Sequence, residues 1–138
     1  MYLVDTNVLI DLANADPQWF DWSARALGEA MRIAPVAINP IIYAELSISY
    51  ASVEILDQAL DQLHVRRLIL PYAAGFLAGR AFLNYRRAGG VRTSPLPDFY
   101  IGAHAAIDGM VVITRDPRRI RTHFPSVSTV SPDVWNPA

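Results

Sequence analysis

The chain has 138 residues, 52% hydrophobic and 18% charged, which is typical of one compact folded domain and excludes a disordered chain. It contains no cysteine, which excludes disulfides, thiolate metal sites and a cysteine nucleophile. No apolar run approaches the roughly 18 residues that span a bilayer, and the first residues lack the basic region of a secretory signal. We therefore expect a single cytoplasmic domain over residues 1–138 that makes no contact with a membrane.

The net charge of −1 conceals an uneven distribution. Residues 1–65 carry nine acids and two arginines, whereas residues 66–138 carry four acids and ten arginines, and lysine is absent. A bias toward arginine codons explains this pattern as well as a function does. The functional interpretation is that the planar guanidinium grips phosphate with two hydrogen bonds.

The first half of the chain predicts short buried strands followed by helices. A strand over 2–5 leads into a helix that starts at Thr6 and ends near Asn14–Asp16. A second helix is expected to begin at Asp16-Pro17, because Asp is a good cap and Pro suits the first helical position. The other predicted elements of this half are a strand over 35–39 and helices over 40–52 and 52–63.

The second half repeats this alternation around a long helix. Residues 72–88 form the longest helical pattern, and Gly89-Gly90 predicts its end. The other expected elements are a strand or edge segment over 65–71, a loop over 89–97, a helix over 98–108, strands over 110–114 and 127–130, and a short helix between these two strands. The whole pattern predicts an α/β fold, with a short parallel sheet flanked by helices on both faces.

Four acids stand where such a fold would gather them. Asp5 directly follows the first strand, and Asp116 follows the strand over 110–114 closely, so both are expected at the carboxyl edge of the sheet, where ligands bind in α/β folds. Asp98 opens a helix, and Glu45 lies in the helix after the second strand. Taken singly, Asp98 and Asp116 are explained as helix caps and Glu45 as an exposed helix residue.

Taken together, the acids indicate a metal site. Several carboxylates at one edge would repel one another and raise their own pKa values unless cations neutralised them. Ligands that are all oxygen suit Mg²⁺ or Mn²⁺, and no histidine lies at a spacing that favours zinc. Such a site can activate water and stabilise the leaving oxygen of a phosphodiester.

Four segments carry a family resemblance: "VDTNVLI" at the start, "YAEL" around Glu45, "PDFYIGAHAA" around Asp98 and "VVITRDP" around Asp116. In this order and spacing they resemble PIN-domain ribonucleases, specifically VapC-type toxins of toxin–antitoxin pairs. Segment 50–90 matches only by its helical pattern.

The resemblance implies a Mg²⁺-dependent endoribonuclease, with Mn²⁺ as the alternative ion. Asp5, Glu45, Asp98 and Asp116 would form the catalytic metal cluster, Asp116 acting partly through water, and the hydroxyls of Thr6 and Thr114 would orient the carboxylates. Water would attack phosphorus and leave a 5′-phosphate and a 3′-hydroxyl. The implied partners are an RNA substrate, a cognate antitoxin and a second copy of the chain.

Four arginines near these segments are candidates for phosphate contact. Arg86, Arg87 and Arg92 flank the loop before Asp98, and Arg115 precedes Asp116. Solvated charge at the ends of helices explains them equally well, so RNA binding by these four residues is a hypothesis that depends on their place in the fold.

Three alternatives remain. The first is a PIN nuclease of RNA processing that has no antitoxin, and the second is a non-catalytic domain of the same fold. The third is a phosphatase that uses Asp5 as nucleophile, a chemistry that usually needs a second Asp where this chain has Asn7, and a lysine, which the chain lacks.

Overall fold

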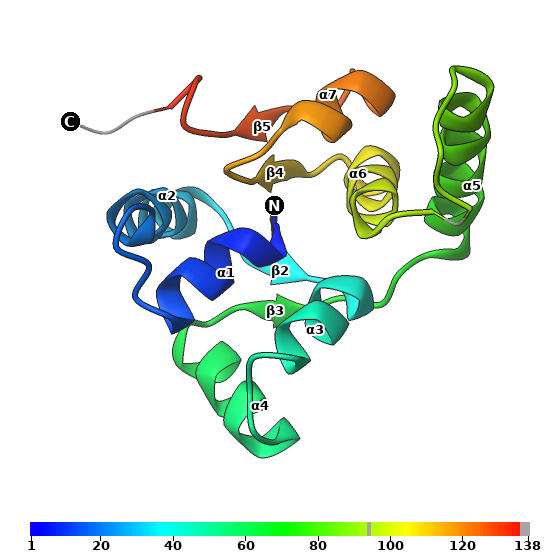
Figure 1. The fold of residues 1–138 in the computed structure, drawn as a ribbon. Coiled ribbons are helices and arrows are strands. Elements are labelled where there is room, and N and C mark those ends of the chain that lie inside the picture. Colours follow the sequence, from blue (N-terminus) through cyan, green and yellow to red (C-terminus); the bar gives the residue numbers. More distant parts are fainter. Residues whose placement is uncertain (94, 136–138) are drawn as a thin grey trace.

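The structure is a computed structural model, which describes residues 1–93 and 95–135. Within these residues five strands form one sheet in the order β3-β2-β1-β4-β5, and every neighbouring pair is parallel (Figure 1). The strands are β1 (Tyr2–Val4), β2 (Val36–Ile38), β3 (Arg66–Arg67), β4 (Val111–Ile113) and β5 (Thr129–Val130). The predicted parallel sheet is confirmed.

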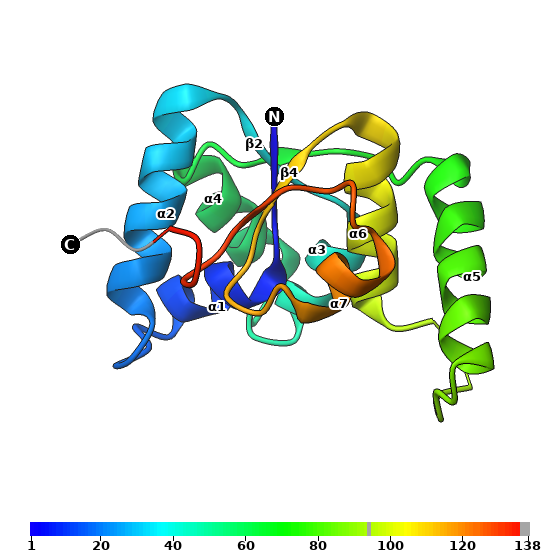
Figure 2. The same ribbon diagram turned by 90° about the horizontal axis from the view of Figure 1, so that it is seen from above.

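Helices cover both faces of this sheet, as the α/β/α prediction requires. They are α1 (Thr6–Ala13), α2 (Phe20–Ile33), α3 (Pro40–Ser47), α4 (Val53–Gln62), α5 (Tyr72–Arg87), α6 (Pro97–Asp108) and α7 (Arg118–His123). Figure 2 shows α2 on one side of the central strands and α6 on the other, with α5 packed outside α6. Among the helices in the described residues, none has the length and apolar character needed to cross a membrane.

The core explains why the strands are short apolar runs. Leu3 and Val4 of β1 and Val112 and Ile113 of β4 are completely buried, because both faces of the sheet are covered. On one of these faces Gly102 of α6 lies directly against the ring of Phe124, where a Cβ atom would overlap the ring. This close approach sets α6 against the segment that follows α7.

Two predicted helix boundaries are wrong. Helix α2 begins at Phe20 and not at Asp16-Pro17, because the Asp16 carboxylate accepts hydrogen bonds from the backbone N–H groups of Gln18 and Trp19 and closes a separate turn first. Helix α3 ends at Ser47, whereas 40–52 was expected. The Ser47 hydroxyl donates to the carbonyl of Ala44 at 2.6 Å, a bond that competes with helix continuation.

The segment 65–71 was expected to be a strand or an edge segment, and its residues Arg66–Arg67 form β3 at the edge of the sheet. Ser52 caps α4, since its hydroxyl accepts a hydrogen bond from the N–H of Ile55. Helix α5 ends within a residue of the predicted position, and Gly89 follows it with a positive φ of 98°, a conformation that favours glycine.

Candidate active site

Polar residues directly follow four of the described strands at the carboxyl edge of the sheet. Asp5, Asn39, Thr114 and Ser131 come immediately after β1, β2, β4 and β5, and all four are buried. Buried polar groups need hydrogen-bond partners, so side chains from distant parts of the sequence bond to one another along this edge.

Asp5 lies within this edge and accepts hydrogen bonds from three neighbours. Its Oδ1 accepts from the backbone N–H of Thr6 at 2.7 Å, which caps α1. Its Oδ2 accepts from the hydroxyl of Thr114 at 2.8 Å and from the side-chain amide of Asn7 at 3.2 Å. The carboxylate is therefore fixed in orientation by groups from both β1–α1 and β4.

The surroundings of Asp5 disfavour its negative charge. Burial raises its pKa to about 6, and the negative charges of Asp98 and Glu45 act in the same direction. The hydrogen bond from Thr114 lowers the pKa of Asp5, but its effect is smaller than that of burial. The fold thus brings Asp5, Glu45 and Asp98 close enough for the charges of the other two to act on Asp5.

Glu45 is joined to the same edge through one residue. Its Oε1 accepts a 2.7 Å hydrogen bond from the hydroxyl of Thr6. The backbone N–H of the same Thr6 donates to the carboxylate of Asp5. Thr6 is buried and Glu45 is half-buried. Thr6 therefore holds carboxylates from α3 and from the end of β1 on either side of it.

Asp98 and Asp116 each face an arginine of α7. Asp98, in the first turn of α6, accepts from Nη1 of Arg119 at 3.3 Å. Asp116 accepts from Nε and Nη2 of Arg118, both at 2.8 Å, and these bonds lower the pKa of Asp116. The four side chains line a cavity of about 320 Å³. This pocket is referred to below as the acid cleft.

Capping does not explain Asp98. The residue before α6 is Leu96, which makes no side-chain capping bond, and Asp98 lies two positions inside the helix end. Asp116 accepts from the backbone N–H of Arg118, but at 3.5 Å, the limit for such a bond. Both carboxylates are thus directed mainly at the guanidinium groups that line the acid cleft.

The acids do not form a ready ligand set. Within residues 1–93 and 95–135, no three side chains of Asp, Glu, His or Cys are grouped so as to hold a metal ion. Arg119 and Arg118 hold Asp98 and Asp116, and Thr6 holds Glu45. The donors still fit a hard divalent cation, because they are all carboxylate oxygens and because the charge on Asp5 is disfavoured by burial and by two other acids.

Three of the four candidate RNA-binding arginines are exposed. Arg86 and Arg87 end α5 and Arg92 lies in the following loop, where the Arg86 guanidinium donates to the Arg92 carbonyl. Their contact with RNA remains a prediction.

Arg115 is placed differently. Its guanidinium donates to both carboxylate oxygens of Asp11 at 2.8 and 2.9 Å and lies 5.5 Å from the ring centroid of Trp19. Asp11 is only 1% exposed and also accepts from Ser23 at 2.7 Å. Arg115 is thus part of a largely buried ion pair that ties the loop before Asp116 to α1.

Sequence reasoning missed Asp11 and the roles of Asn7 and Asn39. Asn7 and Asp11 lie four residues apart on α1, and both bond to Arg115. The available signal was a polar residue at a helical interval within the apolar stretch "NVLIDLA". Asn39 caps α3 and contacts the buried ring of His104 at 3.2 Å.

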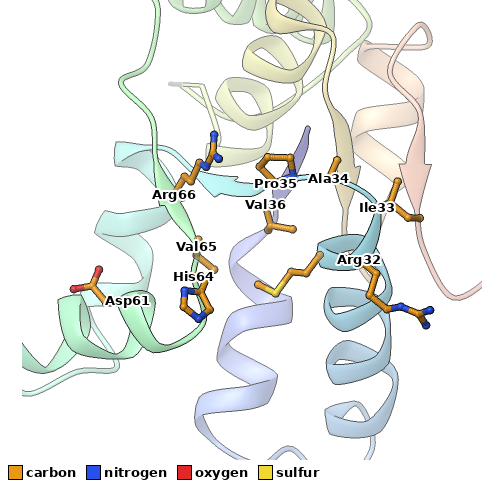
Figure 3. Close-up of a pocket in the computed structure, with 10 residues that line it drawn as sticks. Arg32, Ile33, Ala34, Pro35, Val36, Asp61, His64, Val65 and Arg66 are labelled. Carbon is orange, nitrogen blue, oxygen red and sulfur yellow. The ribbon is translucent and has the colours of Figure 1, made fainter.

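A separate open cavity of about 750 Å³ lies at the opposite, amino-terminal edge of the sheet. Figure 3 shows it between the end of α2 and β3, where Ile33, Pro35, His64 and Arg66 are among its lining residues. None of the predicted site residues lines it. A choice of the site by cavity size alone would therefore have selected this cavity and not the smaller acid cleft.

Comparison with known proteins identifies the family. Residues 2–125 match the PIN domain model. The fold is similar to VapBC2 from Rickettsia felis bound to a DNA fragment from its promoter, with a TM-score of 0.72, 18% identity, and coverage of 94% of this chain and 97% of that one.

Two other solved structures share the fold. FitAcB from Neisseria gonorrhoeae has a TM-score of 0.70 and 21% identity over 98% of this chain and 100% of that one. A toxin–antitoxin complex from Klebsiella pneumoniae has a TM-score of 0.65 and 21% identity over 96% and 98%. No protein with a curated description matches. Because the family model spans nearly the whole sequence, the chain belongs to the PIN domain family.

Proposed function

We propose that the protein is a Mg²⁺-dependent endoribonuclease and the toxin of a toxin–antitoxin pair. The observation that carries this proposal is the position of Asp5 at the carboxyl edge of a parallel sheet, where its charge is disfavoured mainly by burial and further by Asp98 and Glu45. An acid in such a place fits an ion-binding role better than a structural one, because a structural cap alone needs only the bond to Thr6.

Asp5, Glu45 and Asp98 would hold the divalent ion, and Asp116 would act partly through water. Mg²⁺ is the expected ion and Mn²⁺ the alternative, since both prefer oxygen ligands. When bound, the ion supplies Lewis-acid stabilisation of charge on the phosphate and makes water more acidic.

The protein's own groups would position this chemistry. Thr114 and Thr6 orient Asp5 and Glu45 through bonds of 2.8 and 2.7 Å. If Asp98 and Asp116 were to hold a cation in place of their bonds to Arg119 and Arg118, these two guanidinium groups would be free to bind substrate phosphate. Water then forms a bond to phosphorus, the bond from phosphorus to the 3′-oxygen breaks, and that oxygen takes a proton, which leaves a 5′-phosphate and a 3′-hydroxyl.

An antitoxin partner is supported by the similar solved structures. One of these structures is a toxin–antitoxin complex, and others are VapBC assemblies. Co-expression with the product of the adjacent gene, followed by co-purification and loss of RNA cleavage, tests this half of the proposal. A chain that stays active and unbound would instead be a PIN nuclease of RNA processing. A homodimer is the further expectation, which light scattering would check.

Cleavage of RNA by the purified chain tests the catalytic half. We expect cleavage with Mg²⁺, none with EDTA, and loss in Asp5→Asn and Asp98→Asn. Asp21→Asn, which changes an exposed acid of α2, is the matched control and should cleave at the wild-type rate. Sequencing of the product ends would map the cleavage site. Wild-type cleavage by Asp5→Asn would overturn the metal assignment.

A further inference from the structure

A second cavity adjoins the acid cleft and shares Arg119 with it. It has a volume of about 590 Å³ and lies between the end of α5 and α7, where its lining includes Asn84, Tyr85, Gly90, Arg119 and His123. We refer to it as the α5–α7 groove. Figure 2 shows the end of α5, the start of α6 and α7 on the same side of the molecule as the start of α1.

Two half-buried rings line this groove and rest on the residue next to Asp98. The Tyr85 and His123 ring centroids are 5.9 Å apart, and they lie 5.6 and 4.8 Å from the centroid of the buried Phe99. Phe99 directly follows Asp98 on α6. The rings are thus fixed relative to the acid cleft by a rigid helix and by aromatic packing.

The loop after α5 fixes one ring further. Gly90 lies so close to the Tyr85 ring that a Cβ atom would overlap it. In the part of the chain that the structure describes, the Tyr85 hydroxyl and the His123 ring nitrogens have no hydrogen-bond partner. These polar atoms are therefore available to a molecule in the groove, where the planes of the two rings are nearly perpendicular, at 81°.

The charge around the groove is positive. Residues 84–97, which include the end of α5 and the following loop, contain three arginines and no acid. Arg86, Arg87 and Arg92 are exposed around the end of α5, and Arg119 lies between the groove and the acid cleft. A phosphate chain leaving the cleft would meet these cations, whereas a basic or neutral peptide would not gain from them.

We propose that the α5–α7 groove binds one base of single-stranded RNA, next to the phosphate at the acid cleft, with the base stacked on one of the two perpendicular rings of Tyr85 and His123 and bordered by the other. This inference rests on the proposed ribonuclease function and adds a base subsite to it. Aromatic rings beside a positive path are the usual means of binding unpaired bases, and Arg119 makes the path continuous with the site of cleavage. An acidic peptide could use the cations but would leave the ring faces unused.

The test combines a change in the protein with a change in the RNA. The probe is a fluorescein-labelled 12-nucleotide RNA spanning the cleavage site mapped above, with each base next to that site replaced in turn by an abasic nucleotide. Affinity is measured by fluorescence anisotropy in EDTA, so that nothing is cleaved. We expect one abasic position to weaken binding to the wild-type chain by about 5- to 100-fold.

The same abasic change should weaken binding to Tyr85→Leu by less than about 2-fold, because the stacking surface is already lost. Tyr85→Phe keeps the ring and should keep the full penalty. Tyr72→Leu, at the fully exposed start of the same helix, is the control and should also keep it. His123→Leu replaces Tyr85→Leu if circular dichroism shows that the latter is unfolded.

An equal abasic penalty in wild type, Tyr85→Leu and His123→Leu would overturn the subsite, even if the chain cleaves RNA. The subsite would also be overturned if these variants bind RNA as the wild type does but are no longer inhibited by a protein partner. The groove would then be assigned to a protein segment. Failure of the proposed function itself is distinguishable, because the wild-type chain would then yield no cleavage site.

Discussion

The hydroxyl of Thr114 donates a 2.8 Å hydrogen bond to Oδ2 of Asp5, a residue 109 positions away in the sequence. The same oxygen of Thr114 accepts from the backbone N–H of Asp116 at 3.1 Å. One hydroxyl therefore links the end of β1 to the loop that carries another acid of the site. Because Thr114 is completely buried, water cannot replace this link.

Thr114→Val should weaken the metal site without removing an acid. Loss of the hydroxyl leaves Oδ2 of Asp5 with only the longer bond from Asn7 and raises the pKa of Asp5 further, since the bond from Thr114 stabilises the charged carboxylate. We expect the Mg²⁺ concentration for half-maximal cleavage to rise about 10- to 100-fold. Thr114→Ser retains the hydroxyl and should restore most of the affinity. Equal Mg²⁺ dependence of cleavage in Thr114→Val and wild type would show that Asp5 does not need the hydrogen bond from Thr114.

Asp5→Asn should stabilise the metal-free protein. Asp5 has a pKa of about 6 when folded against 3.8 as an ordinary Asp, so above pH 6 the folded state carries a charge that it disfavours. Below that pH the folded state binds the proton first, and this contribution to stability increases as the pH falls toward 4. The free energy of unfolding of Asp5→Asn should exceed that of wild type by about 1–3 kcal/mol at pH 8.

Urea denaturation in EDTA at pH 8 and pH 4 checks this difference, which should nearly vanish at the lower pH. Asp21→Asn provides the comparison with an exposed acid, and its stability should follow wild type at both pH values. If Asp5→Asn is no more stable than wild type at pH 8, then the carboxylate is not under electrostatic stress in the absence of metal.

Arg115→Met should destabilise the fold strongly. It removes the cation from Asp11, which is 1% exposed, and leaves a buried charge unpaired, so we expect a loss of about 3–5 kcal/mol by urea denaturation. Arg32→Met breaks an exposed pair with Glu29 instead and should change stability by less than about 1 kcal/mol. Similar effects of both changes would contradict a structural role for Arg115.

His104 should remain neutral at neutral pH. Its ring is completely buried, and burial lowers its pKa despite the nearby Asp108. Since the unfolded chain then binds the proton more readily, this residue reduces stability as the pH falls below about 6.5. An NMR titration of the ring should give a midpoint below 6.5, and a midpoint above it would mean that Asp108 prevails over burial.

Local sequence patterns were enough to predict most of the fold. Short apolar runs such as "VVI" that alternate with helices are typical of a parallel sheet covered on both faces, so β1, β2 and β4 were predictable. The start of α2 was not predictable from the sequence. An Asp side chain makes the same bond to a backbone N–H in a capped turn as in a capped helix, and tertiary packing selects between the two.

The site was predictable in its place but not in its contacts. The position of Asp5 after a strand places it at the carboxyl edge of the sheet. The bond that Arg119 donates to Asp98 depends instead on how α7 packs on α6. The pair between Asp11 and Arg115 joins residues 104 positions apart, a separation over which no periodicity operates. The α5–α7 groove likewise arises from the packing of Tyr85, Phe99 and His123, which no local motif relates.

The central claim is that Asp5, Glu45 and Asp98 share a divalent cation. Titration of the purified chain with Mn²⁺, followed by electron paramagnetic resonance of the free ion, measures this without any RNA. We predict saturable binding by wild type and Asp21→Asn, weakened at least about 10-fold in Asp5→Asn and Asp98→Asn. Equal affinity in all four proteins would contradict the account, because the ion would then be bound elsewhere.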